Sequence, residues 1–245
     1  IYMPGSNNQL LNCDVSFSTG TGIAIYGSNN LVKNCLIHDT NQVNWPRGTA
    51  VWGAGLDTSG GTNNVFEDNY IYWNHGEGVS ATWGSDGSVL RRNVIADNYS
   101  VNLYVLGSKN VTVDGNLIYN STTAKTWPYG DKSNPDGILI GLEAIGPPGS
   151  SLLDITITNN FLVNNRYGIV VWRETDAPTV PLTGMLIVNN TLVSNDNGMR
   201  LKGTPDFYGN TIQQNIVLDG DVGGYAMEVV PTGPNTFSNN KYYGT

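Results

Sequence analysis

Apolar and turn residues follow each other along this chain in a pattern that repeats from one end to the other. An apolar residue stands three positions before a turn residue and a second stands two positions after it, in nine copies mostly 22 to 25 residues apart. A constant period of this length is typical of one supersecondary unit that is stacked many times. The alternating apolar positions around the turn predict short β-strands. The turn residues are Cys13, Cys35, Asn69, Asn93, Asn116, Asn160, Asn190, Asn215 and Asn240.

The third copy shows the elements that one coil contains. Strands are predicted at 65–67, 70–72 and 79–83, with a sharp turn at Asn69, a loop over 73–78 and a turn at Gly84. Asn tolerates a left-handed backbone, and stacked Asn side chains can hydrogen-bond along the axis, so the Asn row predicts a structural ladder. We therefore predict one elongated all-β domain over residues 1–245, built from about nine coils of three short strands.

Three phrases add a family resemblance to this pattern: GIAIYGSNN at 22–30, NHGEGVSATWG at 74–84 and YGIVVW at 167–172. With the Asn row, they make the whole chain resemble the pectate-lyase-like superfamily. The resemblance implies a right-handed single-stranded parallel β-helix whose inward apolar rows pack coil against coil. Members of that superfamily include polysaccharide lyases, glycoside hydrolases, epimerases, surface adhesins and phage spikes, so it implies a fold and no single activity.

The resemblance also implies where a site would lie, on the outer face of the strand that follows the long loop. The insertions of this chain fall around that strand, at 40–47 and 121–136 before it and at 143–151 and 173–183 after it. Insertions on one side of a solenoid usually mark its working face. Drift in tolerated loops is the alternative explanation.

Strand alternation predicts which side chains of this strand point outward. One coil is predicted to present Ala50 and Trp52, and no charge is expected in the row before Arg200 and Lys202. The row would then lack the carboxylates that acid–base hydrolysis or calcium-assisted elimination needs. Its aromatic and aliphatic side chains fit stacking on sugars, burial under the loops, or contact with another subunit. For stacking on sugars, the substrate-binding candidates are Trp52, Trp83, Tyr104, Trp127 and Trp172.

Candidate catalytic residues lie where the loop enters this strand. His75 and Glu77 form the first pair, and His38, Asp39 and Asp97 lie at nearby heights in neighbouring coils. A His beside a carboxylate can act as a general base. Glu77 stands between two glycines, where it can equally accept backbone N–H groups in a tight turn.

Charge and composition narrow the partners. The net charge of −8 and the pI of about 4.5 exclude nucleic acid as an expected partner and favour neutral ligands. The oxygen-rich stretch 129–137 makes Asp131 and Asp136 candidate ligands for calcium, although it lacks the register of a calcium-binding helix–loop–helix loop. A plain turn-rich loop is the alternative, and no other cofactor is expected. No apolar stretch approaches the roughly 18 residues of a transmembrane helix.

Three further features leave a second function open. Cys13 and Cys35 occupy the same turn in adjacent coils about 4.8 Å apart, as a disulfide or as two stacked thiols. An outward apolar stripe from Tyr70 to Leu218 on the strand after the Asn turn calls for a loop or a neighbouring chain to cover it. The ends of the sequence fall in mid-coil without a cap, which indicates missing flanking sequence or stacking with another copy.

Two functions follow as hypotheses. The first is an extracellular or cell-surface protein that binds or processes a polysaccharide, as a lyase-like or hydrolase-like enzyme or as a glycan binder without catalysis. The second is a structural or adhesive surface solenoid that assembles with copies of itself.

Overall fold

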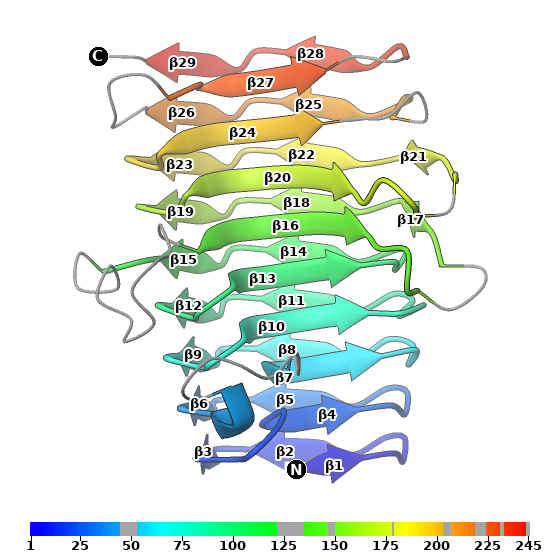
Figure 1. The fold of residues 1–245 in the computed structure, drawn as a ribbon, viewed down its shortest axis with the longest axis vertical. Helices are drawn as coiled ribbons and strands as arrows, with labels where there is room; N and C mark the ends of the chain where they lie inside the picture. Colours follow the sequence, from blue (N-terminus) through cyan, green and yellow to red (C-terminus); the bar gives the residue numbers. More distant parts are fainter. Residues whose placement is uncertain are drawn as a thin grey trace.

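The computed structural model describes residues 1–44, 53–121, 135–146, 150–177, 179–202, 207–218, 224–230 and 233–243. The chain winds through three parallel nine-stranded sheets, here called A, B and C, and returns to the same sheet one coil further along (Figure 1). Sheet A contains β1 (Tyr2–Met3), β4 (Ile23–Ile25), β7 (Ala54–Ser59), β10 (Glu77–Thr82), β13 (Val101–Leu106), β16 (Asp136–Leu142), β20 (Tyr167–Arg173), β24 (Asn197–Lys202) and β27 (Met227–Val230).

Sheets B and C form the other two faces, with mostly three-residue strands. Sheet B contains β2 (Gln9–Leu11), β5 (Leu31–Lys33), β8 (Val65–Glu67), β11 (Val89–Arg91), β14 (Thr112–Asp114), β18 (Thr156–Thr158), β22 (Leu186–Val188), β25 (Thr211–Gln213) and β28 (Thr236–Ser238). Sheet C contains β3 (Asp14–Ser16), β6 (Leu36–His38), β9 (Tyr70–Tyr72), β12 (Val94–Ala96), β15 (Leu117–Tyr119), β19 (Phe161–Val163), β23 (Thr191–Val193), β26 (Ile216–Leu218) and β29 (Lys241–Tyr243). A short pair, β17 (Leu152–Leu153) with β21 (Leu182–Thr183), and a 3₁₀ turn at Gln42–Asn44 complete the described elements. The predicted nine coils of three strands are confirmed.

The core is a column of apolar side chains inside the three sheets. The middle residue of each short strand points inward, so that Ile37, Ile71, Ile95 and Ile118 of sheet C stack in register and are fully buried. Burial of each such side chain is worth roughly 1.5–3 kcal/mol. Because each coil packs only on its neighbours, stability comes from the stacking of coils.

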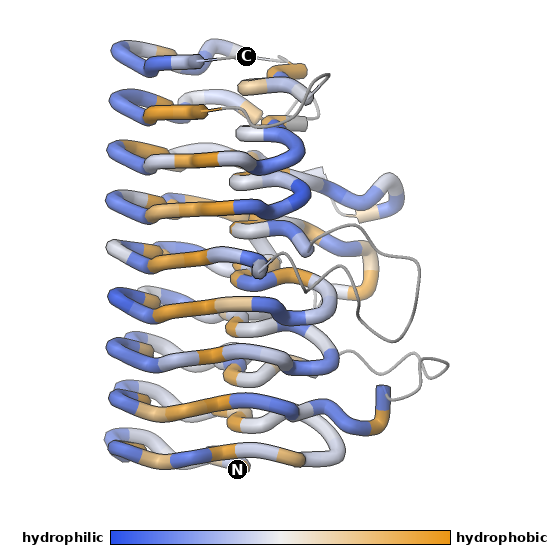
Figure 2. The backbone as a smooth tube through the Cα atoms, turned by 90° about the vertical axis from the view of Figure 1, so that its left-hand side faces the viewer, coloured by the Kyte–Doolittle hydropathy of each residue, from blue (hydrophilic) through white to orange (hydrophobic). Residues whose placement is uncertain are grey.

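The predicted Asn ladder is present at the turn between sheets B and C. The side-chain oxygen of each Asn accepts the backbone N–H of the preceding rung, as in the 3.0 Å bond from Asn69 N to Asn93 Oδ1 and the 2.9 Å bond from Asn93 N to Asn116 Oδ1. The left-handed backbone falls one residue earlier than predicted, at Asp68 and Arg92. Figure 2 shows these hydrophilic turns one above another along one edge of the solenoid. Similar Asn rungs, such as Asn74 with Asn98, close the turn after sheet C.

The two cysteines are free thiols in the structure, at the start of the same ladder. The backbone N–H of Cys13 donates to Cys35 Sγ at 3.4 Å, so sulfur takes the place of the amide oxygen. The apolar stripe predicted on sheet C is exposed at Tyr70, Leu117 and Phe161, without a cover among the described residues. The prediction of a covering chain is not tested by the structure.

One strand differs from the predicted register. The outward pair Ala50 and Trp52 was expected in the coil where β7 runs from Ala54, and both residues lie outside the described part of the chain. In β7, Asp57 pairs with Ala24 of β4 and with Ser80 of β10, so Asp57 holds the outward place. The prediction that the outward row of this sheet carries no charge before Arg200 is therefore wrong.

Candidate active site: an acidic cleft on sheet A

A cleft of about 810 Å³ lies on the outer face of sheet A. Its lining extends from Tyr26, just after β4, to Arg200 of β24. Seven strands at about 4.8 Å spacing make a surface of roughly 29 Å along the axis of the solenoid. An elongated surface of this kind suits a polymer better than a compact small molecule.

Asp57 is the carboxylate at the floor of the cleft. Its Oδ1 accepts hydrogen bonds from Ser80 Oγ at 2.8 Å and from Thr82 Oγ1 at 3.0 Å. Burial raises the pKa of Asp57 to about 6, against the lowering effect of the two hydroxyl donors. Asp57 is therefore ionised at neutral pH and accepts a proton only a little below it.

Glu77 begins β10 and lines the same cleft. Burial raises its pKa to about 8, and the negative charges of Asp57 and Glu143 add to the rise. The Ser80 hydroxyl, which donates to Asp57, opposes part of this rise. With the pKa of Glu77 near 8 and that of Asp57 near 6, the cleft holds a carboxylic acid and a carboxylate at pH 7.

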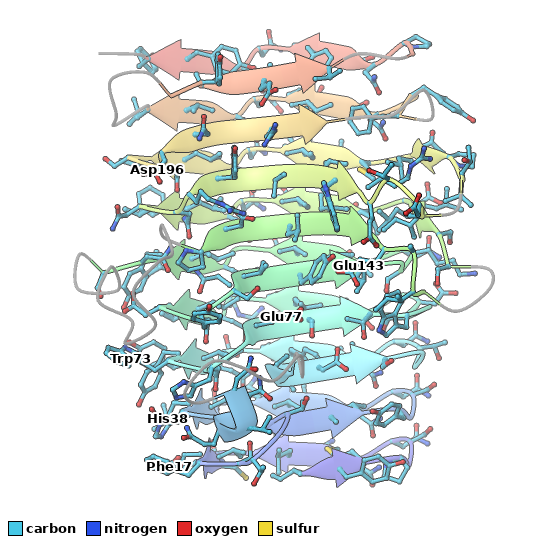
Figure 3. All side chains as sticks on the ribbon, in the orientation of Figure 1. Phe17, His38, Trp73, Glu77, Glu143 and Asp196 are labelled. Carbon is cyan, nitrogen blue, oxygen red and sulfur yellow. The ribbon has the colours of Figure 1, made fainter. Side chains whose placement is uncertain are left out.

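Tyr104 and Glu143 form the next part of the cleft. The Tyr104 hydroxyl donates to Glu143 Oε1 at 2.9 Å, and burial raises the pKa of both groups. The ring of Tyr104 lies against Gly141, where an added Cβ would come within 2.7 Å of the Tyr104 hydroxyl oxygen. Gly141 therefore makes the space that this ring fills. Glu77 and Glu143 project from sheet A in Figure 3.

The far end of the cleft carries cations. Arg166 donates to both carboxylate oxygens of Asp136, at 2.8 and 2.6 Å. Arg200 NH1 donates to Tyr167 Oη at 2.9 Å, and Arg200 Nε lies 2.9 Å from Glu228 Oε2. The expectation of Asp136 as a calcium ligand does not fit a buried carboxylate engaged on both oxygens by a guanidinium. Asp131 lies outside the described residues, among which no group of three His, Cys, Asp or Glu is arranged to hold a metal ion.

The aromatic candidates divide into two groups. Trp83, Tyr104 and Trp172 line the cleft. Tyr104 and Trp172 hold the outward positions that strand alternation predicts, and Trp83 follows the end of β10. Trp52 and Trp127 lie outside the described residues. The substrate-binding role of these five side chains stays a prediction.

The histidine candidates lie apart from the cleft lining, whereas Glu77 is part of it. His38 Nδ1 is 2.8 Å from Asp39 Oδ2, and the charge of Asp39 also acts on buried His75, whose pKa is lowered by burial. Asp39 thus contacts His38 and lies near enough to His75 for its charge to act on that ring. Asp97 Oδ1 accepts the backbone N–H of Ser121 at 2.6 Å, which is the turn-bracing role that the sequence had left open for Glu77.

Sequence reasoning missed Asp57, Glu143 and Arg166. Counting back from the Asn64 turn, which stacks on the Asn30 turn, would have placed Thr58 beside Ala24, because the segment between β7 and this turn is one residue longer than the segment after β4. Glu143 follows the end of β16 and Arg166 precedes β20. Outside a strand, alternation does not predict whether a side chain points inward or outward. Only the folded chain shows that these side chains enter one cleft.

Comparison with known proteins agrees with this architecture. The family model described as the right handed beta helix region matches residues 1–183, more than half of the 245-residue chain. The chain belongs to the right-handed β-helix family. The model described as periplasmic copper-binding protein (NosD) matches residues 151–245 of this β-helix. A comparison with the curated proteins finds no match.

Solved structures resemble this β-helix over almost its whole length. The A-module of the mannuronan C-5 epimerase AlgE4 of Azotobacter vinelandii is 17% identical, with a TM-score of 0.67 over 97% of this chain and 60% of its own. Pectate lyase Pel9A is 15% identical, with a TM-score of 0.53 over 95% and 50%. A double mutant of the tailspike protein of E. coli bacteriophage HK620, in complex with a pentasaccharide, is 11% identical, with a TM-score of 0.60 over 100% and 50%.

These comparisons confirm the pectate-lyase-like right-handed parallel β-helix that the sequence predicted. The chain spans 50–60% of the length of these three structures. At such identities the similarity shows the fold alone. No described segment forms an apolar helix of membrane-spanning length.

Proposed function

We propose that this β-helix binds a neutral polysaccharide along sheet A and hydrolyses a glycosidic bond by acid–base catalysis. The observation that supports the proposal is the pair of carboxyl groups of Asp57 and Glu77, which line one elongated cleft with pKa values of about 6 and about 8. Two carboxyl groups whose pKa values are pushed apart are the requirement for glycoside hydrolysis. A cleft with three acidic side chains at its centre, Asp57, Glu77 and Glu143, disfavours a strongly anionic polymer there.

In this mechanism Glu77 is the acid. Its carboxylic acid donates a proton to the glycosidic oxygen as the bond to the anomeric carbon breaks, and the leaving sugar departs as an alcohol. The Asp57 carboxylate acts on the anomeric carbon in one of two ways. As nucleophile it forms an ester that water then cleaves while Glu77 takes back a proton, and as base it takes the proton of a water molecule that attacks this carbon directly. Ser80 and Thr82 fix the Asp57 carboxylate by their hydrogen bonds.

The fold relatives support a polysaccharide as the ligand, since one is an epimerase of mannuronan, one a pectate lyase, and one was solved with a bound pentasaccharide. They do not distinguish hydrolysis from elimination or epimerisation. The acid–base pair favours hydrolysis here. We further propose that the chain acts outside the cytoplasm, which agrees with the periplasmic description of the NosD family.

The test is a screen of neutral polysaccharides and polyuronates for new reducing ends, with absorbance of unsaturated products measured in parallel. Hydrolysis gives reducing ends without unsaturation. We expect Glu77→Gln and Asp57→Asn each to lower kcat/KM by about 10²–10⁴-fold. Asp114→Asn on sheet B, a partly exposed acid outside the cleft, is the matched control. Unsaturated products, or full activity in both cleft variants, would refute the assignment.

A second candidate function is a structural solenoid that associates with copies of itself. It rests on the exposed apolar side chains of sheet C, among them Leu117, Phe161 and Ile216, because monomers rarely expose long apolar patches. Sedimentation velocity over a hundredfold range of concentration tests it. Association that disappears in Phe161→Lys would support this function, and a monomer at all concentrations would refute it.

A further inference from the structure

A second set of aromatic side chains lies at the end of sheet C in the first three coils, away from the acidic cleft. Ser16, His38 and Tyr72 are cross-strand partners, so the residues that follow them, Phe17, Asp39 and Trp73, stack along the axis of the solenoid. Figure 3 shows Phe17, His38 and Trp73 one above another along this edge, with Glu77 on the neighbouring sheet. We call this set, with Asp14, the aromatic edge.

The two outer rings of the aromatic edge are exposed on a strained backbone. Phe17 is 71% and Trp73 43% exposed, and both have φ of 55°. Bulky side chains rarely adopt this left-handed conformation, which costs roughly 1–3 kcal/mol. The equivalent turn after β19 holds Asn164 at φ 56°, a residue that tolerates this backbone. Neither local backbone preference nor burial in the core accounts for aromatic residues at these two turns.

The His38 imidazole ring, next to these two aromatic rings, is held in place by contacts on several sides. His38 stacks on Tyr72 with ring centroids 4.9 Å apart and an interplanar angle of 11°, and Phe17 meets His38 edge-on at 6.2 Å. Both imidazole nitrogens contact carboxylates, Nδ1 with Asp39 Oδ2 at 2.8 Å and Nε2 with Asp14 Oδ1 at 3.1 Å. The side chains of Asp14 and Asp39 remain 61% and 31% exposed. The edge therefore presents fixed apolar faces bordered by hydrogen-bond acceptors.

We propose that the aromatic edge is a second binding site for a neutral polysaccharide, separate from the cleft. The rings of Phe17 and Trp73 stack on the apolar faces of sugars, and Asp14 and Asp39 accept hydrogen bonds from sugar hydroxyls. The inference goes beyond hydrolysis in the cleft and does not require it.

Three features favour a neutral polysaccharide over other occupants. The rings lie in single file along the axis, about 9.6 Å apart at two coil spacings, which suits a linear chain of sugars. The bordering carboxylates and the net charge of −8 disfavour nucleic acid, polyuronates and anionic lipid surfaces. The direction of the row is also that of the cleft on sheet A, so one polymer type can run along both.

The experiment replaces both rings by the residue that the backbone itself prefers. In the double variant Phe17→Asn, Trp73→Asn, the left-handed turns are retained and the aromatic faces are lost. Binding is measured by affinity electrophoresis in gels that contain mixed-linkage β-glucan, xylan, galactomannan or, as a polyuronate, alginate. The Asp57→Asn background removes cleavage during the measurement. Tyr243→Ala, an exposed aromatic in the last coil of sheet C, is the matched control.

We expect the parent to be retarded by at least one neutral polysaccharide, and the double variant to bind it at least 10-fold more weakly with an unchanged or higher Tm. Retardation of the double variant equal to that of the parent, binding of alginate alone, or no retardation of the parent by any neutral polysaccharide would overturn the inference. Binding at the edge by a protein that hydrolyses nothing would refute the proposed function and leave this inference intact.

Discussion

Replacing Glu77 by Gln should stabilise the protein at alkaline pH, and this prediction needs no substrate. The Glu77 pKa is about 8 in the folded chain against an ordinary value of 4.5. Below pH 4.5 the carboxyl is protonated in both the folded and the unfolded states. As pH rises from 4.5 to 8, the unfolded chain releases this proton and the folded chain keeps it, so the free energy of unfolding falls.

The size of the effect follows from that interval. At 1.36 kcal/mol per pH unit, the loss of stability above pH 8 is at most about 4.8 kcal/mol. Water in the cleft screens Glu77, and Asp57 shares part of the repulsion, so we expect about 2 kcal/mol. Gln keeps the shape and carries no charge. Glu77→Gln should therefore raise Tm by about 4–8 °C at pH 8.5 in a chain of this length.

The assay is thermal unfolding followed by circular dichroism at pH 4.5 and pH 8.5. At pH 4.5 the variant and the parent should have nearly equal Tm values, because Glu77 is mostly protonated in the folded parent. Asp176→Asn, in the exposed turn after β20, serves as the control for the removal of one negative charge. Equal Tm values at pH 8.5, or the same gain at both pH values, would show that Glu77 is not held protonated by its surroundings.

Two further predictions concern the cleft and the ladder. The kcat/KM for hydrolysis should rise through pH 6 as Asp57 ionises and fall through pH 8 as Glu77 ionises, and a profile without a maximum between these values would contradict the roles. Asn160→Ala leaves the buried N–H of Asn116 without its 2.9 Å partner and should cost about 2–3 kcal/mol in chemical denaturation; a cost below about 0.5 kcal/mol would contradict the ladder's role.

The fold could be predicted from the sequence because each coil repeats the same physical requirements. An inward apolar residue on each side of the turn and an Asn that satisfies backbone N–H groups recur nine times with only two replacements, both Cys. An ambiguous strand assignment in one copy can be settled by alignment with the other copies. The strands of sheets B and C therefore match their predicted places, for example 65–67 and 70–72.

The candidate site was harder to predict because it depends on single positions. When a strand is assigned to the wrong stretch of sequence, the wrong residues are predicted to point outward. The sequence prediction placed this strand before Gly53, whereas β7 runs from Ala54 to Ser59, so Ala50 and Trp52 were predicted in the place that Asp57 holds. Ser80 and Thr82 were placed correctly in the outward row, but as uncharged residues they gave no sign of a functional role. Their importance follows only from their 2.8 and 3.0 Å bonds to Asp57. The raised pKa of Glu77 likewise comes from burial, which the sequence does not reveal.

Strand length explains why the cleft lies on sheet A. The six strands from β7 to β24 are six or seven residues long, whereas the strands of sheets B and C have three. A three-residue strand with its middle residue inward offers two outward positions, which stacking fills with repeated polar or apolar rows. A longer strand adds an outward position and carries its ends into the insertions, where Glu143 and Arg166 lie. β1, β4 and β27 are shorter, and the cleft lining does not reach β1 or β27. The coils with long sheet A strands are thus the coils that line most of the cleft, and the acid–base pair lies on two of these strands, β7 and β10.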